Sequence, residues 1–320
     1  MIGEEMSVAI HVDQKRDESL LGASECAGVL GLDTYNPPIK IWRRHRGLSV
    51  PDDAAQSEPA YWGTVLEPIV RGHYAVRSER IVVVPTRSST RDGWLRCTPD
   101  GISIPVPRGE SPRCDVMDSD LSGLIASHNR YASAGNLQVK TCSAWLLDDW
   151  RTAPPAKYEI QCRVEMAVTG LPWSDLVCLC GGQQYLGPFR FERSAEIEDR
   201  ILGPLREFWD MVMSGRAPTV DHTDAWRLHA SEKMERARPV MVRADQPMFD
   251  EIQGWRDARV AVRKAKHAED QAENQILLRL SAAGATRVDA GTIGRITAYK
   301  PNKNRPTWAI KAPAEWKEDQ

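Results

Sequence analysis

The 320-residue sequence contains no run of about 18 apolar residues, so we expect no membrane-spanning helix. Segment 1–20 also lacks the charged-then-apolar layout of a signal peptide. A formal net charge of −2 excludes a uniformly basic nucleic-acid coat, although it allows a local basic channel. The motifs GxSxG and HExxH and a Walker-type glycine loop are absent, so the hydrolase classes that depend on them find little support.

The seven cysteines are odd in number and show no repeating spacing, which favours reduced thiols in a cytoplasm. Cys178 and Cys180 lie on an expected strand whose alternation turns both to one face, where buried thiols are favoured over metal ligands. An iron–sulfur cluster would need about four clustered cysteines. We therefore do not favour that class of nuclease.

Two segments of the sequence together predict a site for a hard cation and a phosphate. Thr98-Pro99-Asp100-Gly101 reads as a strand end that presents one carboxylate, although Pro-Asp-Gly is also an ordinary turn. Residues 137–141, LQVKT, alternate like a half-buried strand, so Gln138 and Lys140 project from the same side. Phosphodiester cleavage requires oxygen ligands for one or two hard cations, and a positive charge near the attacking water.

The N-terminal half predicts three helices. Ser24 could cap a short helix near 24–30, and a second helix around Ile41 and Trp42 carries basic residues that could track phosphates or form a solvated face: Lys40, Arg43, Arg44 and Arg46. Residues 61–77 have amphipathic spacing, but Pro68 should restrict the helix to a start near Leu66 or Glu67. Glu67 would then lie at a helix N-terminus, either as a cap or as a metal ligand.

The following segments predict an α/β domain over residues 1–215. Residues 81–88 and 93–104 form an expected antiparallel pair, and 105–136 form an insertion at the surface. Further along we expect the strand 137–141, helices at 144–150 and 155–170, two strands over 173–193, and a helix over 194–214.

Residues 216–320 predict a C-terminal extension. A long charged helix is expected over 249–283, and residues 291–313 should form a β-hairpin. Basic and aromatic residues alternate in this hairpin, which suits either a nucleic-acid contact or a simple edge hairpin: Arg295, Tyr299, Lys300, Lys303, Arg305 and Trp308.

The order of these parts resembles the PD-(D/E)xK nuclease superfamily, and within it the YqaJ/lambda-exonuclease type of viral recombination nuclease. The resemblance rests on GASECAGVLGL, GTVLEP, TPDG, LQVKT and PAKYEIQCRVEMAVTG, within residues 21–182. It implies a restriction-endonuclease-like α/β core, with a mixed central sheet flanked by helices. It also implies a Mg²⁺-dependent exonuclease, with Mn²⁺ as a substitute, which degrades linear duplex DNA from 5′ to 3′ for recombination by single-strand annealing.

The resemblance further implies partners and a location. The partners are duplex DNA ends, an annealing protein that receives the 3′ strand, and other copies of the chain, since ring-shaped oligomers such as trimers occur in relatives. The location is the cytoplasm of a bacterial or phage-infected cell. The family commonly places Trp and Arg shortly before the GAS segment, where this sequence has only Lys15 and Arg16, with the register off by one. Residues for a 5′-phosphate pocket are therefore not assigned.

By the same resemblance, Asp100 would be a metal ligand, together with Gln138 and the backbone carbonyl of Val139. Lys140 would orient and activate the attacking water. Glu67 would support the second metal position or its waters.

Three further positions match the family's DNA-contacting motifs. Tyr158 and Gln161 correspond to the helix motif beside the active site, and Ser24 to a small hydroxyl residue that can meet a terminal phosphate. We add Arg43 and Arg44 from the basic cluster as expected DNA contacts.

Position 138 departs from the family, because an amide stands where a glutamate is expected. An amide oxygen can bind Mg²⁺ but brings no negative charge, so affinity should fall. Three explanations remain: the site tolerates the amide, another carboxylate has taken over, or the residue is an inactivating substitution. Glu165 is on the polar stripe of Gln161 and could be the replacement, although surface solvation is the favoured role. The alternative function is a DNA-binding protein with weak or lost catalysis.

Overall fold

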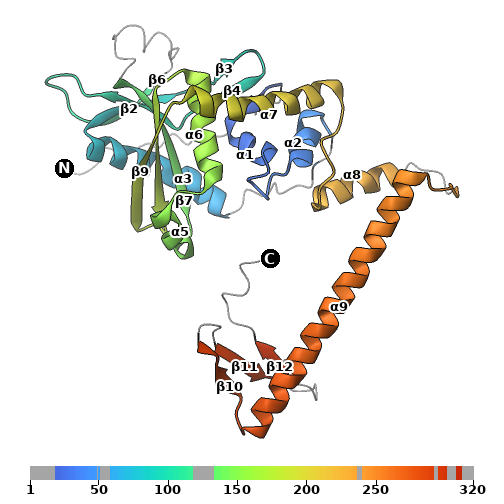
Figure 1. The fold of residues 1–320 in the computed structure, drawn as a ribbon. Helices are drawn as coiled ribbons and strands as arrows, with labels where there is room; N and C mark the ends of the chain where they lie inside the picture. Colours follow the sequence, from blue (N-terminus) through green and yellow to red (C-terminus); the bar gives the residue numbers. More distant parts are fainter. Residues whose placement is uncertain are drawn as a thin grey trace. The chain divides into compact units, whose positions relative to one another are not determined.

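A computed structural model of the chain describes residues 19–48, 50, 58–117, 133–235, 240–291, 295–300 and 308–311. The chain divides into two compact units, Met1–Ala237 and Arg238–Gln320. Within the described parts, no helix combines the length and the apolar character needed to cross a membrane. Figure 1 shows the mixed sheet and helices of the first unit, and the long helix and small sheet of the second.

A six-stranded mixed sheet forms the centre of the first unit, in the order β6-β2-β5-β7-β8-β9. The pairs β2–β6 and β7–β8 are parallel, and the other three pairs are antiparallel. The strands are β2 (Arg80–Pro85), β5 (Gly101–Pro105), β6 (Arg113–Met117), β7 (Gly135–Cys142), β8 (Trp173–Cys180) and β9 (Gln184–Glu192).

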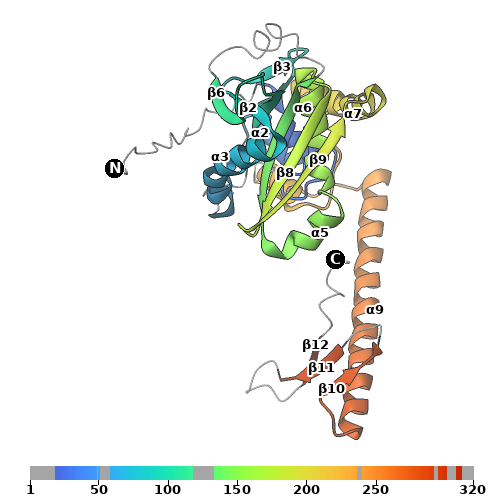
Figure 2. The same ribbon diagram turned by 90° about the vertical axis from the view of Figure 1, so that its left-hand side faces the viewer.

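Helices cover both faces of this sheet (Figure 2). Helix α3 (Glu58–Ser78) packs Val70 and Tyr74 against Leu137 and Val139 of β7. On the other face, α6 (Ala156–Thr169) places Cys162 beside Leu176 and Cys178 of β8. Alternation along β7 turns Gln138 and Lys140 to the same side, as predicted, and this side faces α6. The strand is buried on both sides through Val139 rather than half-buried.

Parallel pairing of β7 and β8 requires a crossover connection, and helices supply it. The chain leaves β7 through a short 3₁₀ turn (Ala144–Leu146) and α5 (Leu147–Thr152), then passes Pro154 and Pro155 into α6. Gly170 ends α6 with a left-handed backbone, φ 75°. The crossover places the full length of α6 beside the strand that carries Gln138.

A second layer packs against α6 and holds the largest apolar cluster of the unit. A small sheet, β1-β4-β3, joins β1 (Leu21–Gly22), β3 (Ser89–Arg91) and β4 (Leu95–Cys97). Around it lie a 3₁₀ turn (Ala23–Glu25), α1 (Cys26–Val29), α2 (Pro38–His45), α7 (Ala195–Ser214) and α8 (Asp224–Met234).

The predicted start of α3 is wrong. The helix begins at Glu58 and continues through Pro68, which therefore lies in its interior. A proline there removes one backbone hydrogen bond and costs about 3 kcal/mol. Burial of Val70, Tyr74 and Ala75 against the sheet offsets this cost. Glu67 consequently lies in the middle of a 21-residue helix, not at its N-terminus.

Three other expectations need correction. The predicted antiparallel pairing is confirmed for β2 and β5, but residues 93–104 form two strands in different sheets, β4 and β5, because the chain bends at Thr98–Asp100. The predicted insertion contributes a strand to the main sheet, β6, while its residues 118–132 lie outside the described residues. Ser24 is not a helix cap: it lies inside the 3₁₀ turn, and the carboxylate of Glu25 accepts the Gly22 N–H, at 3.0 Å.

The second unit contains α9 (Gln246–Ala282), with three short antiparallel strands in the order β10-β11-β12. These are β10 (Arg287–Asp289), β11 (Arg295–Tyr299) and β12 (Ala309–Lys311). The predicted long helix and the pairing of the hairpin strands are therefore present. The hairpin turn, with Lys303 and Arg305, lies outside the described residues.

Helix α8 belongs to the first unit, so the compact unit extends beyond the boundary expected at residue 215. The physical reason is a buried contact. Arg43 on α2 is fully buried, its Nη1 lies 2.8 Å from His229 Nδ1, and its Nη2 donates to Glu232 at 2.6 Å. Both partners lie on α8.

Candidate active site

Asp100 is attached directly to β7 by hydrogen bonds. The residue lies just before β5, and its Oδ2 accepts the backbone N–H of Val139 at 2.7 Å and the side-chain amide of Gln138. Burial raises the pKa of the Asp100 carboxyl, against the opposing effect of the Lys140 charge and the Val139 hydrogen bond. The two motif halves predicted from the sequence thus meet in one place.

Glu67 approaches this place from α3. It forms an ion pair with Arg71, one turn further along the helix. Burial and the nearby charge of Asp100 raise the pKa of Glu67 to about 7, although Arg71 and Lys140 lower it. The charge of Asp100 thus opposes the ionisation of Glu67, and a cation beside the two carboxylates would relieve this repulsion.

Lys140 has an aromatic neighbour on α6. Its Nζ lies 5.3 Å from the centre of the Tyr158 ring, and Lys157 Nζ lies 5.2 Å from the same ring. Tyr158 also stacks on Trp150, with ring centres 5.5 Å apart. Tyr158 therefore forms a wall beside Lys140, as its position in the helix motif predicts.

The role favoured for Glu165 from the sequence, solvation at the surface, is wrong. Glu165 is 1% exposed, so it is not a solvated surface acid. Gln161 donates to Glu165 Oε1 at 3.0 Å, while Oε2 has no hydrogen-bond partner among the described residues. Burial and the charge of Asp100 raise the pKa of Glu165 to about 8. Its spacing from Gln161 was visible in the sequence, but its burial depended on the layer that packs over α6.

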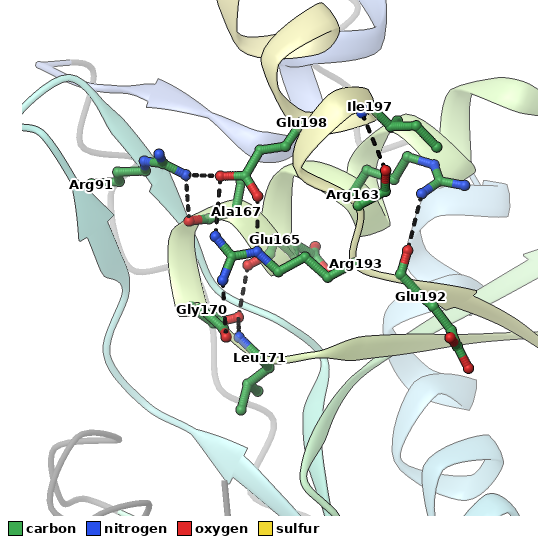
Figure 3. Close-up of polar contacts among 12 residues, drawn as sticks. Arg91, Arg163, Glu165, Ala167, Gly170, Leu171, Glu192, Arg193, Ile197 and Glu198 are labelled. Carbon is green, nitrogen blue, oxygen red and sulfur yellow. Dashed lines mark hydrogen bonds and ion pairs between the residues drawn. The ribbon is translucent and has the colours of Figure 1, made fainter. Parts of the chain in front are cut away.

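The C-terminal end of α6 is fixed by an arginine of β3 and by an arginine that directly follows β9 (Figure 3). Arg91 of β3 donates to the Ala167 carbonyl at 2.9 Å, and Arg193 donates to the Gly170 carbonyl at 3.3 Å. Both guanidinium groups also pair with Glu198 of α7. Within the helix, the Thr169 hydroxyl donates to the Glu165 carbonyl at 2.8 Å. The helix turn that carries Glu165 is thus held in position.

The basic residues of α2 mainly form contacts within the protein. The expected DNA contact at Arg43 is corrected, because this side chain is fully buried and paired with α8. Arg44 pairs with Glu25 at 2.6 Å and His45 with the same carboxylate at 3.1 Å. Burial would raise the pKa of Glu25, but these partners and the Gly22 N–H lower it to about 2. Arg44 keeps a partly exposed side chain, and its DNA contact stays a prediction.

Ser24 is exposed on the 3₁₀ turn that precedes α1. Its hydroxyl is therefore accessible to a ligand, and its predicted contact with a terminal phosphate stays a prediction.

The oxygen donors of this site are of the type that binds a hard divalent cation, but they do not form a complete coordination shell by themselves. Gln138 is 1% exposed, and its Oε1 has no hydrogen-bond partner among the described residues. With the carboxylates of Asp100 and Glu67, this unpaired oxygen gives the donor type that Mg²⁺ prefers. Within the described ranges, no three His, Cys, Asp or Glu side chains are grouped so that they alone could hold a metal ion.

Three cysteines gather next to this site, on β7 and β8. Cys178 and Cys180 are buried, as predicted, and Cys178 Sγ lies 3.4 Å from Cys142 Sγ. None of the seven cysteines forms a disulfide. Burial raises the pKa of the Cys142 thiol to about 11, which makes it a poor nucleophile and metal ligand at neutral pH.

The fold and the site define a mixed α/β core with an acid before one central strand, an amide and a lysine on the next, and a polar helix motif beside them. This is the arrangement expected of a PD-(D/E)xK core. The sequence profile of the YqaJ-like viral recombinase domain matches residues 13–172, half of the chain. The chain belongs to this family.

Individual relatives are more distant. The protein YqaJ of Bacillus subtilis (strain 168) is 27% identical over 228 residues, which cover 68% of this chain and 63% of YqaJ. The chain thus matches less than two thirds of that relative's length. The crystal structure of an alkaline exonuclease, LHK-Exo from Laribacter hongkongensis, is 20% identical. It aligns with a TM-score of 0.43 over 68% of this chain and 95% of the exonuclease chain, and the structure of LHK-Exo with dAMP gives the same values.

Proposed function

We propose that this chain is a divalent-cation-dependent exonuclease that degrades linear duplex DNA from 5′ to 3′ in recombination. The observation that carries the proposal is the contact between Asp100 and β7, which brings an acid, an amide oxygen and Lys140 to one place. Membership of a viral recombinase family supports DNA as the substrate. The annealing partner and a ring-shaped assembly stay predictions.

Each residue of the site has a distinct task in this proposal. Asp100, the Val139 carbonyl and Gln138 would hold Mg²⁺ or Mn²⁺, with Glu67 supporting a second position. The bound cation would supply Lewis-acid stabilisation of the phosphate and a more acidic water. Lys140 would orient the attacking water and offset negative charge on the phosphate. Tyr158 keeps the lysine beside the site, through its ring at 5.3 Å.

The test uses linear duplex DNA labelled at the 5′ or the 3′ end, incubated with Mg²⁺ or Mn²⁺. We expect early loss of the 5′ label with the unaltered chain, and a loss of rate of about 10²-fold or more for Lys140→Ala. Lys157→Ala is the matched control, because this lysine lies equally near the Tyr158 ring. It is expected to change the rate far less. Early loss of the 3′ label would contradict the proposed polarity.

A second candidate, a DNA-binding protein with weak catalysis, is favoured by one observation. Gln138 brings no charge, and its amide donates to Asp100 instead of leaving that carboxylate for a cation. DNA binding without cleavage at either end, in Mg²⁺ and in Mn²⁺, would support this candidate over the exonuclease.

A further inference from the structure

The site around Asp100 is short of negative charge for binding a divalent cation. Asp100 is its central acid, and the residue beside it on β7 is a neutral amide. A hard divalent cation gains much of its binding energy from the number of charged oxygen ligands. A carboxylate elsewhere must therefore compensate if the site binds a cation well.

Glu165 is a buried carboxylate that could supply this missing negative charge. It lies on α6, which packs on the β7 face that carries Gln138 and Lys140. Asn136 of β7 donates its side-chain amide to Thr169 of α6 at 3.1 Å, and Lys140 lies beside Tyr158. The stretch of α6 that carries Glu165 therefore runs along the stretch of β7 that carries Gln138. Two buried oxygens here, Glu165 Oε2 and Gln138 Oε1, have no hydrogen-bond partner among the described residues. A buried oxygen without a partner is costly, which suggests a ligand that completes it.

We propose that Glu165 supplies the carboxylate that position 138 lacks, so that the charge needed for the cation has moved from β7 to α6. This inference rests on the proposed function and specifies its ligand set. The helix is suited to the role because Arg91 and Arg193 fix its end (Figure 3), and because Gln161 already orients Oε1, which leaves Oε2 for the cation.

A buried acid could instead serve packing alone. In that role Glu165 would stay protonated, and the raised pKa, about 8, is consistent with a proton when no cation is bound. The two roles differ in one respect: only a ligand carboxylate can be replaced in function by an acid at position 138.

The experiment exchanges the positions of acid and amide. Four chains are compared: the unaltered chain, Glu165→Gln, Gln138→Glu, and the double variant Gln138→Glu/Glu165→Gln. Mn²⁺ binding is measured by titration calorimetry without DNA, and end degradation is measured separately. We expect Glu165→Gln to weaken Mn²⁺ binding by about tenfold or more. The double variant should recover most of the affinity, because it restores the number of carboxylates.

Glu159→Gln is the matched control: it makes the same change on the same helix, at a residue that pairs with Arg163 and not with the site. It should leave Mn²⁺ binding unchanged, and circular dichroism should show that every variant is folded. Unchanged binding in Glu165→Gln, or no recovery in the double variant, would overturn the inference. If the unaltered chain cuts DNA but Glu165→Gln cuts and binds Mn²⁺ equally well, this inference fails while the exonuclease proposal stands. If the unaltered chain neither binds Mn²⁺ nor cuts, both fail.

Discussion

Burial acts on several glutamates of this protein, but their partners decide whether the pKa rises or falls. Glu25 is as buried as a core residue, yet Arg44, His45 and the Gly22 N–H lower its pKa to about 2. Glu165 accepts one hydrogen bond, from an amide, and is close to Asp100, so its pKa rises to about 8. The site therefore contains buried carboxyl groups whose ionised form lacks a positive partner, and a divalent cation would be a suitable partner.

This difference predicts how stability depends on pH when divalent cations are removed with EDTA. Glu165 has a folded pKa of about 8 and an ordinary value of 4.5, so between these values the folded chain holds a proton that the unfolded chain releases. Its contribution to stability is complete below pH 4.5 and declines as the pH rises through 8. The free energy of unfolding of Glu165→Gln, relative to that of the unaltered chain, should therefore rise by a few kcal/mol from pH 4.5 to pH 9, at ~1.4 kcal/mol per pKa unit. Urea unfolding at both pH values measures this gain, and a constant difference would contradict the buried, unpaired state of Glu165.

At the scale of helices and strands, local sequence patterns predict that an element forms more reliably than they predict where it begins and ends. The alternation of residues 137–141 predicted β7, and the apolar spacing around Pro68 predicted α3. What the sequence could not show was the sheet packing that keeps Pro68 inside a helix, or the second layer that buries Glu165. The wrong start of α3 and the wrong exposure of Glu165 both arise because tertiary contacts outweigh a local preference. The meeting of Asp100 and Gln138 was predicted from family order, while the hydrogen bonds between them came only from the fold.

Gly135 gives a test of how tightly β7 is held at its start. A Cβ atom at Gly135 would lie 2.1 Å from the ring of Trp173, which is buried and contacted by Arg80 and Arg190. The ring cannot move freely, so Gly135→Ala should lower the free energy of unfolding by about 1–3 kcal/mol or more. Gly203→Ala is the control, because nothing lies within 4 Å of its Cβ and alanine favours a helix. The control should be neutral or stabilising in urea unfolding, and equal effects at both positions would refute the close packing.

At the scale of the whole chain, the two compact units differ in what holds them together. The first unit has a sheet covered on both faces and a large second core, while the second rests on α9 and a small sheet, with Leu280, Ile296 and Ala298 as its buried apolar residues among those described. The contact of Arg43 with α8 shows that the first unit includes this helix. A boundary drawn from composition near residue 215 would cut through that contact.

Two truncated chains test this boundary. A chain of residues 1–237 keeps both α8 partners of Arg43 and should unfold cooperatively. A chain of residues 1–216 leaves Arg43 buried without His229 and Glu232, and should be less stable by about 3 kcal/mol or more. Adding Arg43→Met to the shorter chain removes the unpaired charge and should recover part of this stability. Equal stability of the two truncated chains in urea would contradict a structural role for α8.

The basic strands of the second unit predict a contribution to DNA binding that depends on salt. Arg295 and Lys300 are exposed, and Lys300 Nζ lies 5.6 Å from the Trp308 ring, so charge and a stacking surface occur together. Each DNA phosphate that the protein neutralises contributes about 0.9 to the slope of log affinity against log salt. Replacing both residues by glutamate should therefore reduce the slope by about 2, while Arg256→Glu/Arg259→Glu on α9 is a control with the same change of charge. Fluorescence anisotropy on a labelled duplex at several salt concentrations measures the slopes, and equal slopes for the two double variants would show that the hairpin is an edge structure without a specific role in binding DNA.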